Sequence, residues 1–318
     1  MSLKYHLFAR YVAFCVALIP AVVEANFDAH RAPFQVALNQ RVISYSTSFH
    51  ATLPGQTINL TFDEKDDDAY SLVASQQSIN SKAGLIRYLV PSKKGHYSLQ
   101  IKKQNSDASI QLQLFVLVPS TEIKNGSLNG YKIGNYPEPL RGLAEYQAPV
   151  GYIEVTKDIE SLKISPHFTL GQFLCKQASG YPKYIVLRPR LLQKLELFLE
   201  DINSKGIRAD ELVVMSGYRT PHYNRSIGNV SASRHLYGGA ADIFVDVSPK
   251  NNYMDDVNGD GKVTVADATH LYQIADSLVA RTGRKDLTGG VGKYDKTSNH
   301  GPFIHIDVRG TKARWSIE

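Results

Sequence analysis

One stretch of ten residues decides how the second half of this chain folds. Residues 233–242 read Ser-Arg-His-Leu-Tyr-Gly-Gly-Ala-Ala-Asp. His235 comes just before a turn, and Gly238 and Gly239 allow the chain to fold back there because glycine adopts backbone conformations closed to other residues. Asp242 lies on the apolar run that leaves the turn, which predicts a buried strand. The turn therefore brings an imidazole and a carboxylate toward one place.

A third side chain is predicted to join them from a second strand. His305 lies between Ile304 and Ile306 in a strand-like run. Because alternate strand residues face opposite sides, the two isoleucines face away from His305. Catalytic zinc typically takes three nitrogen or oxygen ligands from the protein and leaves a fourth position to water. His235, Asp242 and His305 are the predicted zinc ligands, since turn, strand and flanking residues all agree on one site.

The same residues carry a resemblance to a known family. Three segments contain them: Ser216-Gly-Tyr-Arg-Thr-Pro221 with Asn224, the Ser-x-His-x-x-Gly-x-Ala-x-Asp pattern of 233–242, and the ending from His305-x-Asp307 to Arg314-Trp315. They resemble the zinc D-Ala-D-Ala carboxypeptidases and murein endopeptidases, from about Ser165 to Trp315. The resemblance implies a small α+β domain with zinc on an antiparallel sheet. It also implies His235, Asp242 and His305 as ligands, and hydrolysis of peptidoglycan peptides by metal-activated water.

The general base is left open by the sequence. Some members of the family have an acidic residue three positions before the last histidine, where this chain has Pro302. Asp307 is the first candidate, as a base or as the partner that orients a ligand histidine. His300 is the second candidate, and a solvated loop histidine is the alternative. Arg219 is expected to bind a substrate carboxylate or the developing oxyanion, with a surface ion pair as the alternative.

A second motif, residues 256–267, resembles an EF-hand loop with Gly261 at its sharp turn. The expected calcium ligands are Asp256, Asn258, Asp260, the backbone carbonyl of Lys262, Thr264 and Asp267. The last of these stands where a bidentate glutamate is usual, as in dockerin-type loops. A helix is predicted to follow. This insertion, about 254–282, is expected to stiffen a wall of the zinc cleft; a metal-free acidic turn is the alternative, and a regulatory or structural role for calcium is left open.

The N-terminus predicts export. Lys4 and Arg10 precede an apolar run, and Val23-Glu24-Ala25 resembles a cleavage site, so residues 1–25 are predicted to be a signal peptide. The run is too short for a comfortable membrane span. We therefore expect no stable span after cleavage, with an uncleaved anchor as the alternative, and a periplasmic or cell-envelope location.

Composition and charge are those of a folded protein. The net charge is +6 and the pI is about 9.1. These values suit an anionic partner, but no dense basic stripe or RNA-type aromatic motif favours nucleic acid. Cys15 lies in the predicted signal peptide, so Cys175 has no partner for an intrachain disulfide in the mature protein.

The chain is predicted to be multidomain. Short β-rich runs separated by turns predict a sandwich-like domain over residues 26–122. Residues 123–164 are predicted to be a linker and packing segment. Residues 165–318 are predicted to be the α+β peptidase domain, with a small antiparallel sheet and a helix that begins at Pro189.

The leading hypothesis is a zinc-dependent peptidase that hydrolyses peptidoglycan stem peptides or their crosslinks. The alternative is a non-catalytic cell-wall-binding protein stabilised by zinc and calcium, and Pro302 is the residue that keeps it open. A weaker option is wall attachment through the N-terminal domain with catalysis secondary. The sequence leaves open which peptidoglycan bond is cut and which oligomer forms.

Overall fold

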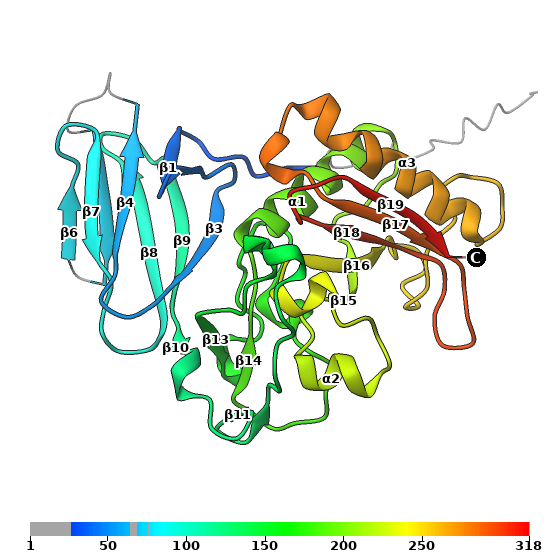
Figure 1. Cartoon of the computed structure of the whole chain (residues 1–318). Coiled ribbons are helices and arrows are strands. Elements are labelled where there is room, and N and C mark those ends of the chain that lie inside the picture. The colour runs from blue at the N-terminus through cyan, green and yellow to red at the C-terminus, as the bar shows by residue number, and fades with distance from the viewer. Residues whose placement is uncertain (1–26, 64–68, 76, 318) are drawn as a thin grey trace, which may run out of the picture.

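The computed structural model of the chain describes residues 27–63, 69–75 and 77–317. The predicted signal peptide lies outside these residues. The protein is mixed α+β: sheets dominate the N-terminal end, and a further sheet with helices forms the C-terminal end (Figure 1). Among the described residues, no helix is both long and apolar enough to cross a membrane.

Two sheets make up the N-terminal region. The first has the order β2-β1-β4-β7 and consists of Arg41–Val42, Val36–Leu38, Thr57–Phe62 and Leu85–Leu89. The second has the order β3-β9-β8-β5-β6 and consists of Thr47–Thr52, Ser109–Val116, Gly95–Lys103, Tyr70–Ala74 and Gln77–Asn80. In β4, Ile58, Leu60 and Phe62 are buried while Thr57 and Thr61 are exposed, the two-residue period of a strand with one covered face. Side chains of both sheets form one apolar cluster.

The predicted packing segment wraps onto the C-terminal region. Strand β10 (Val118–Pro119) and η1 (Ser120–Glu122) lead into it. The segment itself contains the hairpin β11 (Ser127–Leu128) and β12 (Tyr131–Lys132), η2 (Leu140–Gly142), η3 (Ala144–Tyr146), β13 (Gly151–Val155) and η4 (Lys157–Ile159). Strand β13 pairs with β10 and with β14 (Lys183–Ile185). The Tyr136 hydroxyl contacts the Tyr218 hydroxyl at 3.0 Å and donates to the Leu236 carbonyl at 2.9 Å. The segment is therefore part of the packed structure around the site.

The C-terminal sheet positions the site. Its order is β15-β16-β18-β17-β19, with bounds Val213–Ser216, Ala240–Phe244, Phe303–Asp307, Gly290–Tyr294 and Ala313–Ile317. The pairs are antiparallel except β17 with β19, which run parallel. This differs from the expected antiparallel sheet because the chain reverses after β18, near Gly310, and returns along the far edge of β17.

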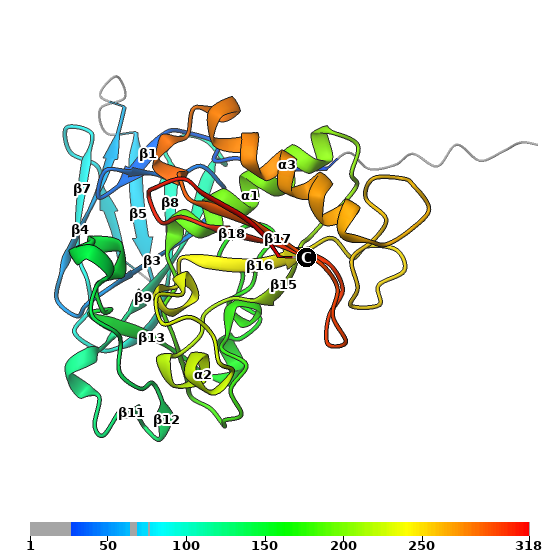
Figure 2. The same ribbon diagram turned by 45° about the vertical axis from the view of Figure 1, so that its right-hand side comes forward.

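Two helices, α1 (Pro189–Ser204) and α3 (Val265–Thr282), lie together over one face of this sheet (Figure 2). Proline at the first position of α1 suits a helix start, and Thr264 caps α3 by accepting a hydrogen bond from the Ala266 amide. Ile304 and Ile306 belong to the same apolar cluster as α3 residues such as Leu271. His305 therefore faces the other side of the sheet.

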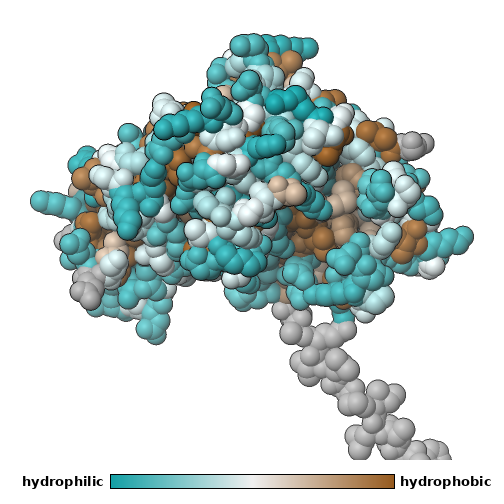
Figure 3. Space-filling model, turned by 90° about the horizontal axis from the view of Figure 1, so that it is seen from below, coloured by the Kyte–Doolittle hydropathy of each residue, from teal (hydrophilic) through white to brown (hydrophobic). Residues whose placement is uncertain are grey.

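The remaining elements are short: η5 (Leu170–Phe173), α2 (Pro221–Ser226), η6 (Arg234–Tyr237) and η7 (Lys285–Leu287). The N-terminal region contacts the C-terminal region through Phe49 and Phe115, which join its apolar cluster, and through an ion pair between Arg31 and Glu200 at 2.5 Å. On the face drawn in Figure 3, hydrophilic residues dominate and apolar residues lie in small groups, one of them in a recess.

Candidate metal centre

Three elements bring the predicted ligands together. Asp242 and His305 are direct cross-strand partners on β16 and β18. His235 lies in η6, which ends at Gly238 with a φ of 61°. A Cβ atom at Gly238 would lie 2.2 Å from the Val186 carbonyl oxygen, so both the backbone conformation and the space require glycine. The turn that the sequence predicted therefore places His235 over the two strands.

The three ligand atoms lie close to one another. His235 Nε2 is 3.2 Å from Asp242 Oδ1 and 3.3 Å from His305 Nδ1, and His305 Nδ1 is 2.8 Å from Asp242 Oδ1. All three residues are buried. Ligands of a tetrahedral zinc ion, each ~2.0–2.2 Å from the metal, are separated from each other by about 3.3–3.6 Å. The group therefore fits a single zinc-sized cation.

The hydrogen bonds behind the two imidazoles decide which nitrogens carry lone pairs. His235 Nδ1 lies 2.6 Å from the Gly217 carbonyl oxygen, which can only accept, so Nδ1 donates and Nε2 is left with its lone pair. His305 Nε2 lies 3.2 Å from Asp307 Oδ2, so this nitrogen donates and Nδ1 keeps its lone pair. Two lone pairs and a carboxylate oxygen thus converge, an arrangement that a cation stabilises.

The charges around the group favour the same conclusion. Burial lowers the pKa of His235, which favours the neutral imidazole that binds metal. Burial alone would raise the pKa of Asp242, but His235 and His305 beside it hold that pKa well below its usual value. Burial also acts to lower the pKa of His305, and hydrogen bonds to Asp242 and Asp307 outweigh it and raise that pKa. The ionised Asp242 carboxylate lies against His305 Nδ1, and such a pair binds either a proton or a metal ion between its two atoms.

A comparison with known protein families indicates a function for this group of three residues. Residues 166–258 match the family model Peptidase M15. The match includes His235 and Asp242, stops before His305 and covers less than half of the chain. Together with the group of three, it supports zinc peptidase activity.

No curated protein matches the chain. One similar solved structure is the endo-beta-1,4-mannanase from Thermotoga petrophila, at 7% identity and a TM-score of 0.20, over 26% of this chain and 20% of that chain. This likeness is too low to indicate a shared fold.

Asp307 lies outside the segment that matches Peptidase M15. It contacts Nε2 of His305, the ring nitrogen that points away from Asp242. It is fully buried and its two oxygens accept hydrogen bonds from Arg309 Nε at 3.1 and 2.9 Å and from the Gly290 amide at 2.7 Å. Burial acts to raise its pKa, but His305 and Arg309 hold that pKa far below its usual value. These contacts support the orienting role of Asp307. Its role as a base stays a prediction without a contact that supports it.

Within the Peptidase M15 segment, Arg219 lies directly beside the ligands. Its Nη2 atom is 2.7 Å from Asp242 Oδ2, and its Nε atom donates to Ser216 Oγ at 2.8 Å. Only 12% of the side chain is exposed. The guanidinium therefore lies within the candidate metal centre, where it fixes the Asp242 carboxylate, and it is not a surface ion pair.

The structure places His300 apart from the ligands. Its Nδ1 atom is 2.8 Å from the Gly301 carbonyl oxygen, and its ring packs against Phe303. It lines a separate cavity of about 510 Å³ with Tyr253 and Pro302. No contact between His300 and the three ligand residues is found in the described part of the chain. The catalytic role of His300 stays a prediction.

Trp315 is included in the family resemblance, but the sequence assigns no role to it and does not single out the residues that pack around it. The Trp315 ring lies 5.1 Å from the His305 ring, and its Nε1 atom donates to the Tyr294 hydroxyl at 2.8 Å. A Cβ atom at Gly292 would lie 2.3 Å from Trp315, so glycine on this strand makes room for the indole. A glycine inside a strand pattern is the one local signal for such a close approach.

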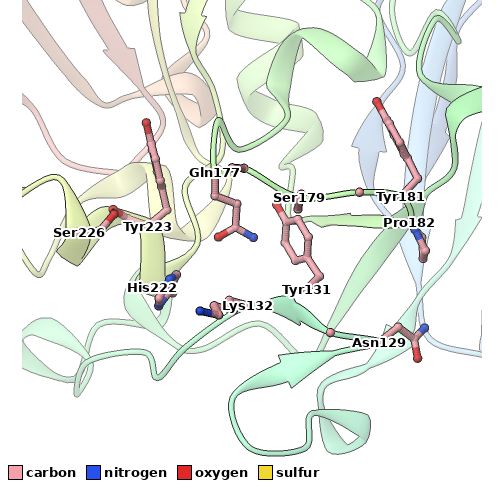
Figure 4. A pocket seen from close by; sticks show the side chains of 13 residues that line it. Asn129, Tyr131, Lys132, Gln177, Ser179, Tyr181, Pro182, His222, Tyr223 and Ser226 are labelled. Atoms are coloured by element: carbon pink, nitrogen blue, oxygen red, sulfur yellow. The ribbon is translucent and has the colours of Figure 1, made fainter.

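A polar cavity of about 580 Å³ lies beside part of the segment that matches Peptidase M15. The hairpin β11–β12, residues 177–182 and α2 form its walls. Gln177, His222 and Lys132 point into the same space (Figure 4). Gln177 also accepts a hydrogen bond from Thr220, next to Arg219, at 3.0 Å. The cavity adjoins the loop that carries Arg219, but the three ligand residues do not line it.

The loop predicted to bind calcium is closed by its own hydrogen bonds. Asp256 accepts from the Gly259 amide at 2.8 Å, and Gly261 adopts a φ of 79° at the sharp turn. Asp267 is fully buried and accepts from the Val257 and Thr264 amides at 2.9 and 2.8 Å. Among the described residues, the one group of histidine, cysteine or acidic side chains close enough to hold a metal is that of His235. The structure does not show a calcium site.

Proposed function

We propose that this protein is a zinc-dependent peptidase that hydrolyses peptidoglycan stem peptides or their crosslinks. The observation that carries the peptidase part is the convergence of two imidazole lone pairs and one carboxylate oxygen in and beside the segment that matches Peptidase M15. The peptidoglycan part rests on the resemblance of residues 216–242 and 305–315 to the carboxypeptidases and endopeptidases of the cell wall.

His235, Asp242 and His305 would hold the zinc ion through Nε2, Oδ1 and Nδ1. When bound, zinc would lower the pKa of a water molecule and polarise the scissile carbonyl. Asp307 holds His305 in the required tautomer, and the Gly217 carbonyl does the same for His235. Arg219 fixes Asp242 and presents a guanidinium beside it, suited to a substrate carboxylate or a developing oxyanion.

Digestion of purified peptidoglycan by the zinc-loaded protein, with the fragments identified by mass, tests this function and names the bond that is cut. The expected result is cleavage that stops on chelation and in His235→Ala. His222→Ala is the matched control, because His222 is outside the ligand group. Retention of full activity by the metal-free protein, or by a folded His235→Ala variant, would contradict the proposal.

The alternative function is a non-catalytic cell-wall-binding protein stabilised by zinc and calcium. Pro302 in place of the acidic residue favours it, as does Asp307, whose oxygens are already engaged by Arg309 and Gly290. X-ray absorption of the zinc-loaded protein separates the two functions. A closed shell of four protein ligands would favour the binding protein, and three protein ligands with a water would favour the peptidase.

We also propose the remaining parts of the organisation. Residues 26–122 would form a sandwich-like spacer or wall-binding module, and export by residues 1–25 would place the protein in the periplasm or envelope. Binding of isolated peptidoglycan sacculi by the full chain, compared with a chain cleaved after residue 122, tests the first. The molecular mass of the exported protein tests the second, since cleavage would remove residues 1–25.

Calcium binding by residues 256–267 is the remaining proposal, and it rests on the sequence pattern alone. If the loop binds calcium, the melting temperature of the protein should rise with millimolar calcium and not with magnesium. Asp256→Asn should abolish the rise. A melting temperature that is insensitive to calcium in the unmodified protein would leave the loop as an acidic turn.

A further inference from the structure

Three arginines surround one carboxylate next to the metal-bearing helix η6. Arg188 precedes α1, Arg190 is in its first turn, and Arg234 comes directly before the ligand His235. Arg190 Nη2 lies 2.6 Å from Glu145 Oε1, Arg188 Nη1 contacts Oε2, and Arg234 Nη2 is 3.6 Å from Oε2. Arg188 and Arg234 also donate to the backbone carbonyl of Glu145.

The cluster has more positive charge than its partner balances. Three guanidinium groups face a single carboxylate, so two positive charges are left over locally. Arg234 is only 2% exposed, and its Nε and Nη2 atoms have no hydrogen-bond partner. It is stacked between the rings of Tyr146 and Tyr237, at 4.4 and 5.0 Å. Buried donors without partners are costly, and a bound anion is one way to satisfy them.

Glu145 belongs to a segment with few other anchors. Residues 137–150 are mostly exposed, including Leu140 at 42% and Leu143 at 45%, and within η3 only Tyr146 is buried. The side chain of Glu145 is itself 26% exposed, as is that of Arg188. A carboxylate from solution can therefore reach this ion pair and compete with Glu145 for it.

The cluster adjoins the metal centre on two sides. Arg188 donates from its backbone amide to the Gly238 carbonyl at 2.9 Å and from Nε to the Tyr237 carbonyl at 3.0 Å, in the turn that follows His235. On the other side, the positive charge of Arg234 interacts with the carboxylate of Asp307, which orients His305. A ligand held at the cluster would lie next to the metal centre.

We propose that Arg188, Arg190 and Arg234 form a binding site for a carboxylate of the peptide ligand, and that Glu145 occupies it as a stand-in from the same chain. The proposal rests on the proposed function, since stem peptides carry free carboxylates. Ligand binding then requires Glu145 to leave, which releases the segment around η3 from the site. Glu145 therefore lowers the apparent affinity for carboxylate ligands by keeping the site occupied.

The test is calorimetric binding of N-acetyl-D-alanine and of its neutral amide to the zinc-loaded full chain. Glu145→Ala should bind the free acid at least about tenfold more tightly than the unmodified protein does, because the competing carboxylate is gone. Binding of the amide should not change. Glu145→Gln keeps the shape and removes the charge, so it should show the same gain and decides the matter if the alanine variant does not fold.

Two controls separate this site from general charge effects. Glu138→Gln removes an exposed negative charge from the same segment and should give no gain. Adding Arg190→Met to Glu145→Gln should cancel the gain. If Glu145→Gln gains no affinity for the acid over the amide, Glu145 is a structural anchor and the proposal is overturned. Because this binding needs no hydrolysis, it also distinguishes failure of the arginine site from failure of the proposed peptidase activity.

Discussion

Asp242 and His305 face each other across β16 and β18, and Asp242 Oδ1 lies only 2.8 Å from His305 Nδ1. An arginine supports each of them, directly for Asp242 and through Asp307 for His305. Arg219 fixes Asp242, and Arg309 fixes the Asp307 carboxylate that orients His305. The second of these supports is the more easily tested, because Asp307 does not contact the predicted metal position.

Asp307→Asn should weaken zinc binding by roughly 10–100-fold, since the asparagine no longer supplies the charge that holds the His305 tautomer. The affinity is measured by competition with a chelator. Asp286→Asn, which removes an exposed carboxylate paired with Arg284, is the control and should leave zinc affinity unchanged. An unaltered affinity in Asp307→Asn would remove Asp307 from the metal centre.

Gly238→Ala should destabilise the fold by more than about 2 kcal/mol, because the backbone is left-handed and the new methyl group would overlap the Val186 carbonyl. The free energy of unfolding in urea measures this. Gly228→Ala is the matched control: its φ is 67° but no atom lies within 4 Å of the new Cβ, so it should cost only about 1 kcal/mol. Equal losses in the two variants would contradict the close packing of the turn that follows His235.

Gly292→Ala should displace the indole of Trp315 from His305, because the added Cβ would lie 2.3 Å from the ring. Trp315 is the one tryptophan in the chain, so its fluorescence reports this position alone. We expect a shift of the emission maximum and weaker zinc binding. An emission spectrum identical to that of the unmodified protein would show that the ring does not pack over Gly292.

Lys194 should make stability rise with pH in the alkaline range. Burial lowers its pKa to about 8, and its ammonium donates to the Asp307 carbonyl at 2.8 Å. Between pH 8 and its unfolded pKa of about 10.4, the unfolded chain binds more protons than the folded one, so the free energy of unfolding increases with pH by up to about 3 kcal/mol.

Lys194→Met removes this titration while keeping an unbranched side chain. The difference in unfolding free energy between the unmodified protein and this variant should therefore change in favour of the unmodified protein as pH rises from 8 to 10. Other groups cancel in the difference. A difference that is constant over this range would contradict the lowered pKa of the Lys194 ammonium.

The convergence of His235, Asp242 and His305 could be predicted from sequence because its determinants are local. The glycine turn after His235 and the strand alternation around His305 are both visible within a few residues. Two of the supports behind these side chains depend on tertiary contacts: the Gly217 carbonyl and Lys194 reach the site from separate elements. No periodicity could reveal them.

The same limit applies to the fold and to the arginine cluster. The helix over Val265–Thr282 follows from its cap and its apolar spacing. The parallel pairing of β19 with β17 does not, because it depends on which sheet edge the returning chain joins. Likewise Glu145 and Arg190 are 45 positions apart, and only the fold of the packing segment brings them together.

The most direct measurement is a crystal structure of the protein grown with zinc, with anomalous diffraction recorded at the zinc absorption edge. The account predicts one strong peak about 2.0–2.2 Å from His235 Nε2, Asp242 Oδ1 and His305 Nδ1. A structure with no peak among these atoms, or with the three side chains turned away from one another, would contradict it.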